Sequence, residues 1–241
     1  MCGRFTLKGP PNQIAKMLGL DIVPNLEPRF NIAPTQETIA VRMEDGGRAL
    51  VKLKWGLVPF WAKDASIGSK MINARADTVA EKPAYRHAFA KRRCLIPTDG
   101  FYEWQSHGKS APKQPHHIHR PDGEPFAFAG LWERWEKGNE PFETFTIITT
   151  DAPESLTDIH HRVPVILTAD GMERWLRTAE EEADGLADLL KPLPDGELVA
   201  EPVSTTVNNV RNDGPACLEP ANDTEPETES KPKAAQGDLF G

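Results

Sequence analysis

The stretch KPAYRHAFAKRRCLIPTDGFYEW, residues 82–104, places a helix-forming segment directly before two strand-forming segments. Residues 82–93 suit a helix with Pro83 in its first turn, where the missing N–H costs nothing. Residues 94–104 predict a strand, a turn and a second strand, because apolar runs flank the turn-forming Thr-Asp-Gly. A helix followed by strand, turn and strand, without a regular βαβ rhythm, predicts an α+β fold.

The rest of the chain extends this pattern, because strand-like segments dominate and helices are interspersed among them. The expected elements are hairpins over residues 38–61 and 116–135, strands over 142–150 and 163–167, and helices over 10–20 and 171–190. We therefore expect an α+β fold whose core is a mostly antiparallel, partly closed β-sheet with short helices on its flanks.

Length and composition predict one globular domain followed by a tail. The chain has 241 residues, of which 39% are hydrophobic and 27% are charged, enough to bury a core. No apolar run approaches the ~20 residues of a membrane span and no secretory signal is visible. We expect a cytoplasmic protein without a membrane partner, and a monomer. Residues 1–218 would form the catalytic domain, and the polar, acidic residues 219–241 would be disordered.

The net charge of −8 is unevenly distributed along the chain. Acidic residues are concentrated in residues 180–201 and 219–241, which leaves residues 1–179 slightly basic. A local basic face matters more to a polyanion than the total charge, so the composition permits nucleic-acid binding.

The cysteines and histidines do not form a recognisable metal or disulfide pattern. The three cysteines are too few and too scattered for a disulfide framework, and no CxxC spacing suggests a zinc site. His117 and His119 would share one face of a strand, a spacing that some metal sites use, but no cysteine or acidic partner is nearby in the sequence. We expect no metal and no cofactor.

Cys2 follows the initiator methionine directly, at a chain end that rarely contributes to a core. Removal of Met1 would leave an N-terminal cysteine with a free amine and a thiol on adjacent carbons, and both groups are nucleophiles near neutral pH. The amine can attack an aldehyde to form a Schiff base, and the thiol can then close a thiazolidine ring. The simpler interpretation is a chance cysteine on a frayed end.

Three further stretches offer polar side chains in suggestive pairs. Asn73 and Arg75 lie two residues apart and would share a side of an extended segment. Glu103 lies between two aromatic residues, which could raise its pKa and let it carry protons. His160 and Arg162 form a similar pair, and histidine is an acid and base near neutral pH. Each also has an ordinary structural interpretation, as a turn, solvated strand or surface residue.

Together these stretches resemble the SRAP family, the SOS response-associated peptidase-like proteins that crosslink to abasic sites in DNA. The matching motifs run in order from residue 1 to about residue 216; they are MCGRF, RFNIAPTQ, WGLVPFWAKD, INARADTVAEKPAYRHAFAKRRCLIPTDGFYEW, FAFAGLWE, TIITTDA, IHHRVP and VSTTVNNVRNDGP.

The resemblance implies an enzyme that crosslinks abasic sites in single-stranded DNA, with related lyase-type or peptidase-type chemistry, in DNA repair and the SOS response. Cys2 would be the nucleophile, Asn73 would bind the sugar or the amine, Glu103 would relay protons, and His160 would protonate the sugar oxygen. The implied DNA-binding residues are Arg4, Arg75, Trp104, Arg162, Trp55, Trp61 and Thr149. The two tryptophans in WGLVPFW, Trp55 and Trp61, fit a core equally well. The protein would associate with the nucleoid when bound to DNA.

Two other functions remain open from the sequence. A cysteine peptidase would use Cys2 as a thiolate and His160 as a base, with autoprocessing as its natural reaction. A non-covalent single-stranded DNA binder would not need Cys2. Covalent capture that depends on Cys2 separates the three.

The stretch QGDLFG ends the chain with two adjacent apolar residues on an otherwise polar tail. Gln236, Leu239 and Phe240 resemble the short peptide by which bacterial proteins bind the sliding clamp of the replisome. We expect this motif to tether the protein to the clamp, although short motifs often match by chance.

Overall fold

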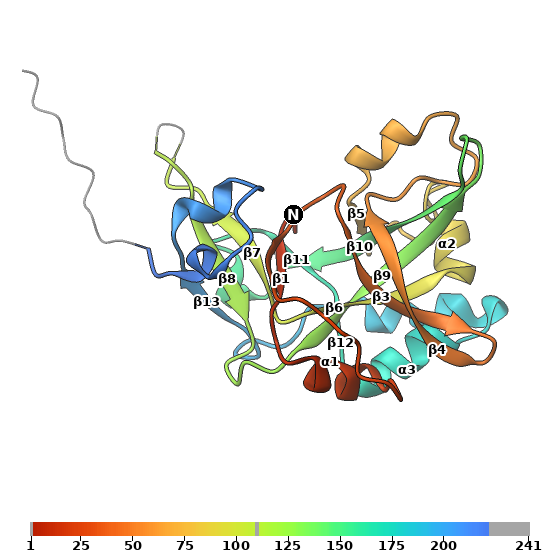
Figure 1. Ribbon diagram of the computed structural model, residues 1–241, viewed down its shortest axis with the longest axis horizontal. Coiled ribbons are helices and arrows are strands. Elements are labelled where there is room, and N and C mark those ends of the chain that lie inside the picture. The colour runs from red at the N-terminus through yellow and green to blue at the C-terminus, as the bar shows by residue number, and fades with distance from the viewer. Residues whose placement is uncertain (1, 109–110, 222–241) are drawn as a thin grey trace, which may run out of the picture.

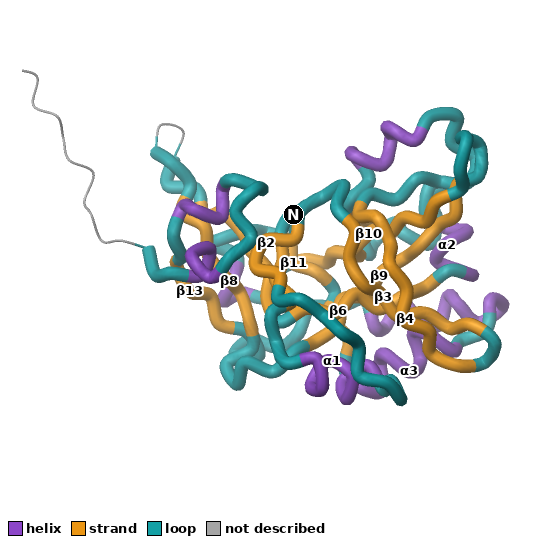
Figure 2. The backbone as a smooth tube through the Cα atoms, in the orientation of Figure 1, coloured by secondary structure: helices purple, strands orange, loops and turns teal. Residues whose placement is uncertain are grey.

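Two β-sheets form the core of the protein, and short helices cover their outer sides (Figures 1 and 2). The computed structural model describes residues 2–108 and 111–221. In Figure 1, the strands of the smaller sheet A lie on the left and those of the larger sheet B lie on the right.

Sheet A has five strands in the order β13-β8-β7-β1-β2, and all of its pairings are antiparallel. Its strands are β1 (Phe5–Leu7), β2 (Arg29–Ile32), β7 (Gly100–Gln105), β8 (Gln114–His119) and β13 (Val199–Pro202). The sheet is open, so β13 and β2 are its two edge strands.

Sheet B has eight strands and closes on itself. They are β3 (Glu37–Glu44), β4 (Gly47–Trp55), β5 (Asn73–Arg75), β6 (Arg93–Thr98), β9 (Phe126–Trp135), β10 (Phe142–Asp151), β11 (Arg162–Pro164) and β12 (Ile166–Leu167). Because β10 pairs with both β4 and β9, the path β10-β4-β3-β6-β9 returns to its start. Only the pairings of β10 with β4 and β5 are parallel. The predicted α+β fold with a mostly antiparallel, partly closed sheet is confirmed.

The helices are short. They are α1 (Pro11–Leu18), α2 (Arg86–Lys91) and α3 (Ala169–Arg177), with 3-10 helices η1 (Ala65–Lys70), η2 (Glu154–Leu156), η3 (Glu180–Leu189), η4 (Thr205–Asn208) and η5 (Pro215–Leu218). The expected helix over residues 10–20 is confirmed, and Gly19 ends it in the left-handed conformation with φ 60°. The helix expected from residue 82 begins only at Arg86, because Pro83 lies in the turns that precede it.

The β3–β4 hairpin is also confirmed, and its turn explains its register. Asp45 and Gly46 have φ values of 48° and 81°, as a two-residue turn matched to the twist of the strands requires. The expected hairpin over residues 116–135 is wrong, because β8 pairs within sheet A and β9 within sheet B. Residues 94–104 likewise divide between the sheets, since β6 belongs to sheet B and β7 to sheet A.

An aromatic cluster joins the two sheets. The ring of Phe5, from β1, lies 5.2 Å from Trp55 and 5.9 Å from Phe128, which belong to sheet B. Trp55 stacks on Phe145 at 6.0 Å. All four side chains are fully buried, so the first strand of the chain is fixed in the core by its aromatic residue.

The described part of the chain contains no helix both long and apolar enough to cross a membrane.

Near the predicted domain boundary, an isolated β-bridge joins Val203 to Pro220. The clamp-like residues Gln236, Leu239 and Phe240, and nearly all of the tail predicted to be disordered, lie outside the described residues.

Candidate active site

Cys2 lies immediately before β1 and is fully buried. Two features hold the chain here: β1 is an inner strand between β2 and β7, and the backbone N–H of Tyr102 donates to the carbonyl of Arg4 at 3.0 Å. The Cys2 thiol is 3.8 Å from the same carbonyl, within reach of a weak hydrogen bond. The cysteine is therefore a fixed group and not a frayed end.

Glu103 lies on the neighbouring strand β7 and is 2% exposed. Burial raises the pKa of its carboxyl to about 7, and the positive charge of the chain's amino terminus opposes that rise. Burial also raises the pKa of the Cys2 thiol, and the nearby charge of Glu103 adds to this effect. A carboxyl with a pKa near 7 can both accept and donate a proton at neutral pH.

Asn73 reaches Cys2 from the other sheet. It lies on β5, and its Nδ2 atom donates to the Cys2 carbonyl at 2.8 Å. Its Oδ1 atom is buried and has no hydrogen-bond partner within the described chain. The hydroxyl of Tyr85 donates to the Asn73 carbonyl at 3.2 Å, and this hydrogen bond helps to hold β5 in place. The candidate site therefore forms where strands of both sheets meet.

His160 precedes β11 and is partly buried. Its Nδ1 atom lies 3.0 Å from the Arg162 backbone nitrogen and 3.2 Å from the Arg162 carbonyl oxygen, so one residue holds this side of the ring. Burial lowers the pKa of the imidazole to about 4, and the charges of the amino terminus and His161 act in the same direction. His160 is thus neutral at pH 7, with a proton on one ring nitrogen.

Arg162 and Thr149 are not available to DNA in the way that the sequence suggested. Arg162 is 3% exposed; its guanidinium donates to the Thr149 carbonyl and, at 2.9 Å, to Asp151. Thr149 is fully buried, and its hydroxyl donates to the Ala74 carbonyl at 3.3 Å. These two residues join β11 to β10, so Thr149 is not accessible to a DNA strand in this structure and Arg162 is not an exposed clamp.

Arg75, in contrast, is exposed, and its guanidinium pairs with the equally exposed Asp77 at 2.6 Å. It lines a groove of about 510 Å³ that also contains Trp61, Asn73, Lys82 and Tyr85. The groove therefore leads from an exposed cation and an exposed indole to the residue that binds Cys2.

The two tryptophans of WGLVPFW have opposite environments. Trp55 is fully buried and its indole N–H donates to the Ile72 carbonyl at 2.9 Å, so it takes the core position that the sequence left open and is not accessible to DNA in this structure. Trp61 is 44% exposed, with a long hydrogen bond of 3.3 Å to the Pro83 carbonyl. Only the second can present a ring face to a base.

Trp104 and Arg4 lie together on the sheet A side of the site. The Arg4 guanidinium lies 5.8 Å from the Trp104 ring, and the Trp104 indole donates to Asn208 at 2.7 Å. Arg4 itself donates to Asn31 at 2.9 Å and to the Val207 carbonyl at 2.8 Å. Its charge is thus largely engaged within the protein, whereas Trp104 keeps a partly exposed ring.

The sequence alone did not identify Asn31 and Asp213, which hold together the segments around Arg4 and Trp104. Asn31 is fully buried and donates to the carbonyls of Val207, Asn209 and Asn212. Asp213 accepts from the backbone N–H groups of residues 30 and 31 at 2.6 and 2.8 Å. Both lie in motifs that were noted, RFNIAPTQ and VSTTVNNVRNDGP, but a motif does not show which residues it joins.

The HHIH run, residues 116–119, lies on β8 (Gln114–His119). The rings of His117 and His119 stack at 5.1 Å, which confirms that they share a strand face. Within the described residues, no group of three or more histidine, cysteine, aspartate or glutamate side chains is arranged to hold a metal.

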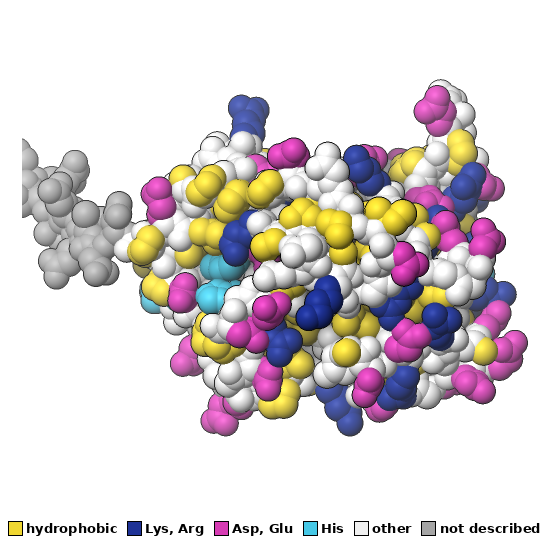
Figure 3. Space-filling view, turned by 60° about the horizontal axis from the view of Figure 1, so that its bottom comes forward, with side chains coloured by type: hydrophobic (Ala, Val, Ile, Leu, Met, Phe, Trp, Pro, Cys, Tyr) yellow, Lys and Arg dark blue, Asp and Glu magenta, His cyan; other side chains and the backbone are white. Residues whose placement is uncertain are grey.

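Figure 3 shows basic and acidic side chains interspersed on one face of the molecule, so this face has no continuous basic surface.

The fold and the site define an α+β protein of two sheets that holds an N-terminal cysteine between a buried glutamate and an asparagine. The chain belongs to the family described as SOS response associated peptidase (SRAP), whose model matches residues 1–210.

Relatives and solved structures agree with this membership. The chain is 42% identical over 224 residues to the abasic site processing protein YoqW of Bacillus subtilis, covering 91% of this chain and 99% of the relative. It is 39% identical to the abasic site processing protein HMCES of Gallus gallus, covering 72% of this chain and 58% of that longer relative. A crystal structure of a Bacteroides thetaiotaomicron protein superposes with a TM-score of 0.77 at 30% identity, covering 91% of this chain and all of that one.

Proposed function

We propose that this protein captures abasic sites in single-stranded DNA as a covalent crosslink to Cys2, once Met1 has been removed, and so protects the lesion during replication. The observation that carries the proposal is the 2.8 Å hydrogen bond from Asn73 to the Cys2 carbonyl, beside a buried carboxyl whose pKa is about 7. The names of its relatives, abasic site processing proteins, support the same substrate. The place of action would be the nucleoid.

The chemistry needs two bond-forming steps at one carbon. The amine of Cys2 attacks the aldehyde carbon of the ring-opened sugar, and loss of one water gives an imine. The thiol then adds to the imine carbon, its proton leaves the sulfur and the imine nitrogen gains one. The product is a thiazolidine, and the net change is the loss of one water.

Each polar group near Cys2 has a task in this scheme. Glu103 would take a proton from the amine or the thiol and return it to the departing water, as a carboxyl with a pKa near 7 can. A ring N–H of the neutral His160 side chain would donate to the sugar oxygen during ring opening. The free Oδ1 of Asn73 would accept from the amine or from a sugar hydroxyl.

The DNA strand would follow the groove of Arg75 and Trp61. Arg75 would contact a phosphate, which positions the strand without reading its sequence. Trp61 and Trp104 would offer stacking surfaces on the two sides of the site. Arg162 would reach a phosphate only if its contacts with Asp151 and Thr149 were exchanged, so its main task is to hold β11 and His160.

A peptidase function is less well supported. Cysteine peptidases depend on a thiolate whose pKa is lowered, whereas burial raises the pKa of the Cys2 thiol. Crosslinking tolerates this because the amine attacks first and the thiol adds to an imine already in place.

The decisive test is to incubate the purified protein with a single-stranded oligonucleotide containing one abasic site and to resolve the products on a denaturing gel. We expect a heat-stable band for the wild type and none for Cys2→Ser, because serine keeps the amine but offers a poor second nucleophile. Non-covalent binding should persist. A heat-stable adduct of normal yield with the serine variant would contradict the thiazolidine.

The tail adds a second proposal, in which Gln236, Leu239 and Phe240 bind the bacterial sliding clamp. A tether of this kind would deliver the crosslinking domain to template strands at stalled forks by raising its local concentration. Burying one leucine and one phenylalanine yields ~1.5–3 kcal/mol each before ordering costs, which suits a weak, reversible contact.

A further inference from the structure

The chain passes from sheet B to sheet A at a single residue, Asp99, which lies between β6 and β7. Asp99 is 2% exposed, and none of the steps proposed above uses it. Glu103 lies four residues further along the chain, on β7. A buried carboxylate at this point has a structural cost unless its oxygens are well bound.

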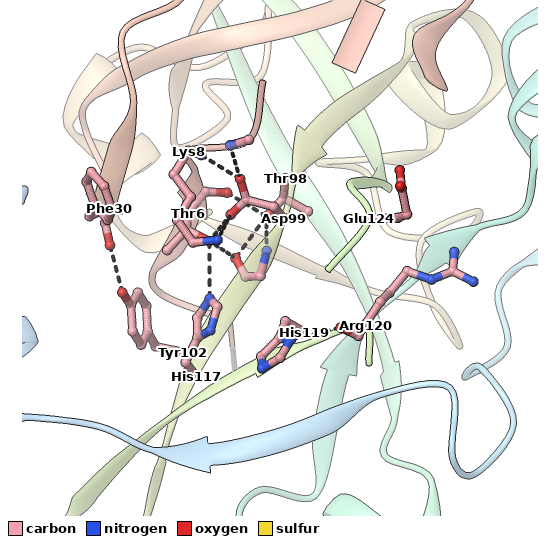
Figure 4. A network of polar contacts seen from close by, with 12 residues as sticks. Thr6, Lys8, Phe30, Thr98, Asp99, Tyr102, His117, His119, Arg120 and Glu124 are labelled. Atoms are coloured by element: carbon pink, nitrogen blue, oxygen red, sulfur yellow. Dashed lines mark hydrogen bonds and ion pairs between the residues drawn. The ribbon is translucent and has the colours of Figure 1, made fainter. Parts of the chain in front are cut away.

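The Asp99 carboxylate is bound by the segment that follows Cys2 (Figure 4). Its Oδ2 atom accepts from the backbone N–H groups of Lys8 and Gly9 at 2.5 and 2.6 Å. Its Oδ1 atom accepts from the Thr6 hydroxyl at 2.5 Å. The Asp99 backbone N–H also donates to the Thr6 carbonyl at 3.1 Å, so one residue makes four contacts with this segment.

A histidine extends these contacts to a third strand. The Nε2 atom of His117, on β8, lies 3.2 Å from the Thr6 hydroxyl oxygen. Because the hydroxyl gives its proton to Asp99, His117 is the donor. Gly100 of β7 leaves the gap for this contact, since a Cβ atom there would lie 2.1 Å from Nε2. The hydrogen-bond chain thus runs from β8 past β7 to β1 and ends at Asp99.

β1 needs these additional hydrogen bonds because its own pairing with β7 is short. β1 has three residues, and its register with β7 consists of Phe5 opposite Phe101 and Thr6 opposite Gly100. Thr6 is four residues after Cys2, and Asp99 is four residues before Glu103. The Thr6–Asp99 contact therefore ties together, at one point, the two segments that carry the nucleophile and the proton carrier.

We propose that Asp99, acting through Thr6 and the backbone of Lys8 and Gly9, is a positioning residue that sets Cys2 against Glu103 for the crosslinking reaction. This inference rests on the proposed function. The proposal predicts an effect on the reaction rate and not on DNA binding. The groove that Arg75 and Trp61 line contains none of the residues that contact Asp99.

The test compares substitutions that break the contacts with substitutions that keep them. Asp99→Ala should slow single-turnover crosslinking at saturating DNA about 10- to 100-fold, the cost of misplacing reacting groups by a fraction of an ångström to an ångström. Its affinity for the same oligonucleotide, measured in a Cys2→Ser background, should change less than about twofold. Asp99→Asn should recover most of the rate, because its Oδ1 can accept from Lys8 and Gly9 while its Nδ2 donates to Thr6.

A second pair of variants keeps the proposal testable if Asp99→Ala does not fold. Thr6→Val has the shape of threonine without the hydroxyl, and should slow crosslinking, whereas Thr6→Ser keeps the hydroxyl and should react like the wild type. Equal rates for Thr6→Val and Thr6→Ser, both at the wild-type level, would overturn the proposal.

A matched control separates positioning from general loss of stability. Thr168 caps α3, where its hydroxyl accepts from the Gly171 N–H at 3.2 Å, so Thr168→Ala destabilises the fold away from the site. At temperatures chosen for equal fractions folded, Thr168→Ala should crosslink at the wild-type rate. If it were slowed as much as Asp99→Ala, the effect would be one of stability alone and the proposal would be wrong.

A measurement on the unreacted protein distinguishes this inference from the proposed function. The pKa of the Glu103 carboxyl, followed by carbon NMR, should fall below about 7 in Asp99→Ala as water enters beside a loosened β1, and should not change in Thr168→Ala. If the wild type does not crosslink, the proposed function fails, yet this pKa still reports whether Asp99 holds the site. An unchanged pKa together with an unchanged rate would contradict the positioning role.

Discussion

Two buried glutamates, one in each sheet, differ in what surrounds them. Glu133, on β9 of sheet B, is 1% exposed and is paired with Arg92 and, more distantly, with His87. Glu103, on β7 of sheet A, is 2% exposed, and it lies beside Cys2 and the amino terminus instead of a guanidinium. Burial raises the pKa of both carboxyls, to about 7 for Glu103, whereas the charge of Arg92 opposes the rise at Glu133. Burial alone therefore does not identify a reactive carboxyl. Glu133 is bound by a guanidinium, whereas Glu103 lies beside Cys2, where the proposed function needs a proton carrier.

The largest effect that tests this comparison is on the reaction rate. Glu103→Gln should slow crosslinking ~10²–10⁴-fold because the proton carrier is lost, with the fold intact. Glu133→Gln should leave the rate unchanged and lower the free energy of unfolding by about 1–3 kcal/mol, because it weakens a buried charge-assisted hydrogen bond. Timed denaturing gels and urea unfolding measure the two quantities. A reversed pattern would remove the distinction between the two glutamates.

The pH dependence of stability sharpens the same test. The folded pKa of Glu103 is raised from 4.5 to about 7, so the folded state binds more protons than the unfolded state in this window. Its contribution to stability is therefore present below pH 4.5 and falls as pH rises, by about 1.4 kcal/mol per pH unit, until pH 7. The difference between Glu103→Gln and the wild type should grow over this range in favour of the variant and then level off. A constant difference would show that the carboxyl has an ordinary pKa.

A pair of tryptophans extends the comparison to apolar side chains. Trp55→Ala should cost ~3–5 kcal/mol of stability, because the ring is fully buried between Phe5 and Phe145. Trp104→Ala should cost little stability and should weaken single-stranded DNA binding by ~1–3 kcal/mol, the value of one stacked base. Thermal unfolding and fluorescence anisotropy measure these effects. Equal losses of stability would place Trp104 in the core as well.

A pair of arginines gives a smaller effect. Arg75→Ala should leave stability unchanged and flatten the salt dependence of DNA binding by up to ~0.7 in log–log slope, the value of one phosphate contact. Arg162→Ala should cost about 1.5–3 kcal/mol of stability, because it removes a hydrogen bond from a buried charged group, although the Thr149 carbonyl keeps the Ala76 N–H as a donor. Binding titrations at several salt concentrations separate the two. An unchanged slope for Arg75→Ala would argue against a phosphate contact.

The smallest effect on crosslinking is expected in the tail. Replacing Leu239 and Phe240 with alanine should leave crosslinking to naked DNA unchanged and abolish binding to the clamp of the same organism, measured by calorimetry. The paired control is the intact chain. Equal affinity of both proteins for the clamp would end the proposal.

The sequence predicted element types better than partners. Alternating residues identify a strand such as β8, but nothing in that alternation says whether it pairs with β9 or β7, since pairing is decided by contacts distant in the chain. The same limit applied to the site. Asn73 and Glu103 were named from the residues beside them in the sequence and from the family resemblance, whereas the contacts of Asp99 involve two backbone N–H groups that no side-chain pattern reveals. Trp55 and Trp61 could not be distinguished in the sequence, and only the structure shows that the first is buried and the second exposed.

The position of β1 as an inner strand also bears on how the protein is made. β1 pairs with β2 nearby and with β7 about a hundred positions later in the sequence, and Arg4 binds a carbonyl 203 positions further on. The contacts of β1 with β7 and of Arg4 with η4 therefore form only after those later segments have been synthesised. Until then Cys2 lacks the surroundings that bury it in the folded protein. On the proposed function, a nascent chain that does not yet contain β7 lacks Glu103, so its Cys2 has no proton carrier beside it.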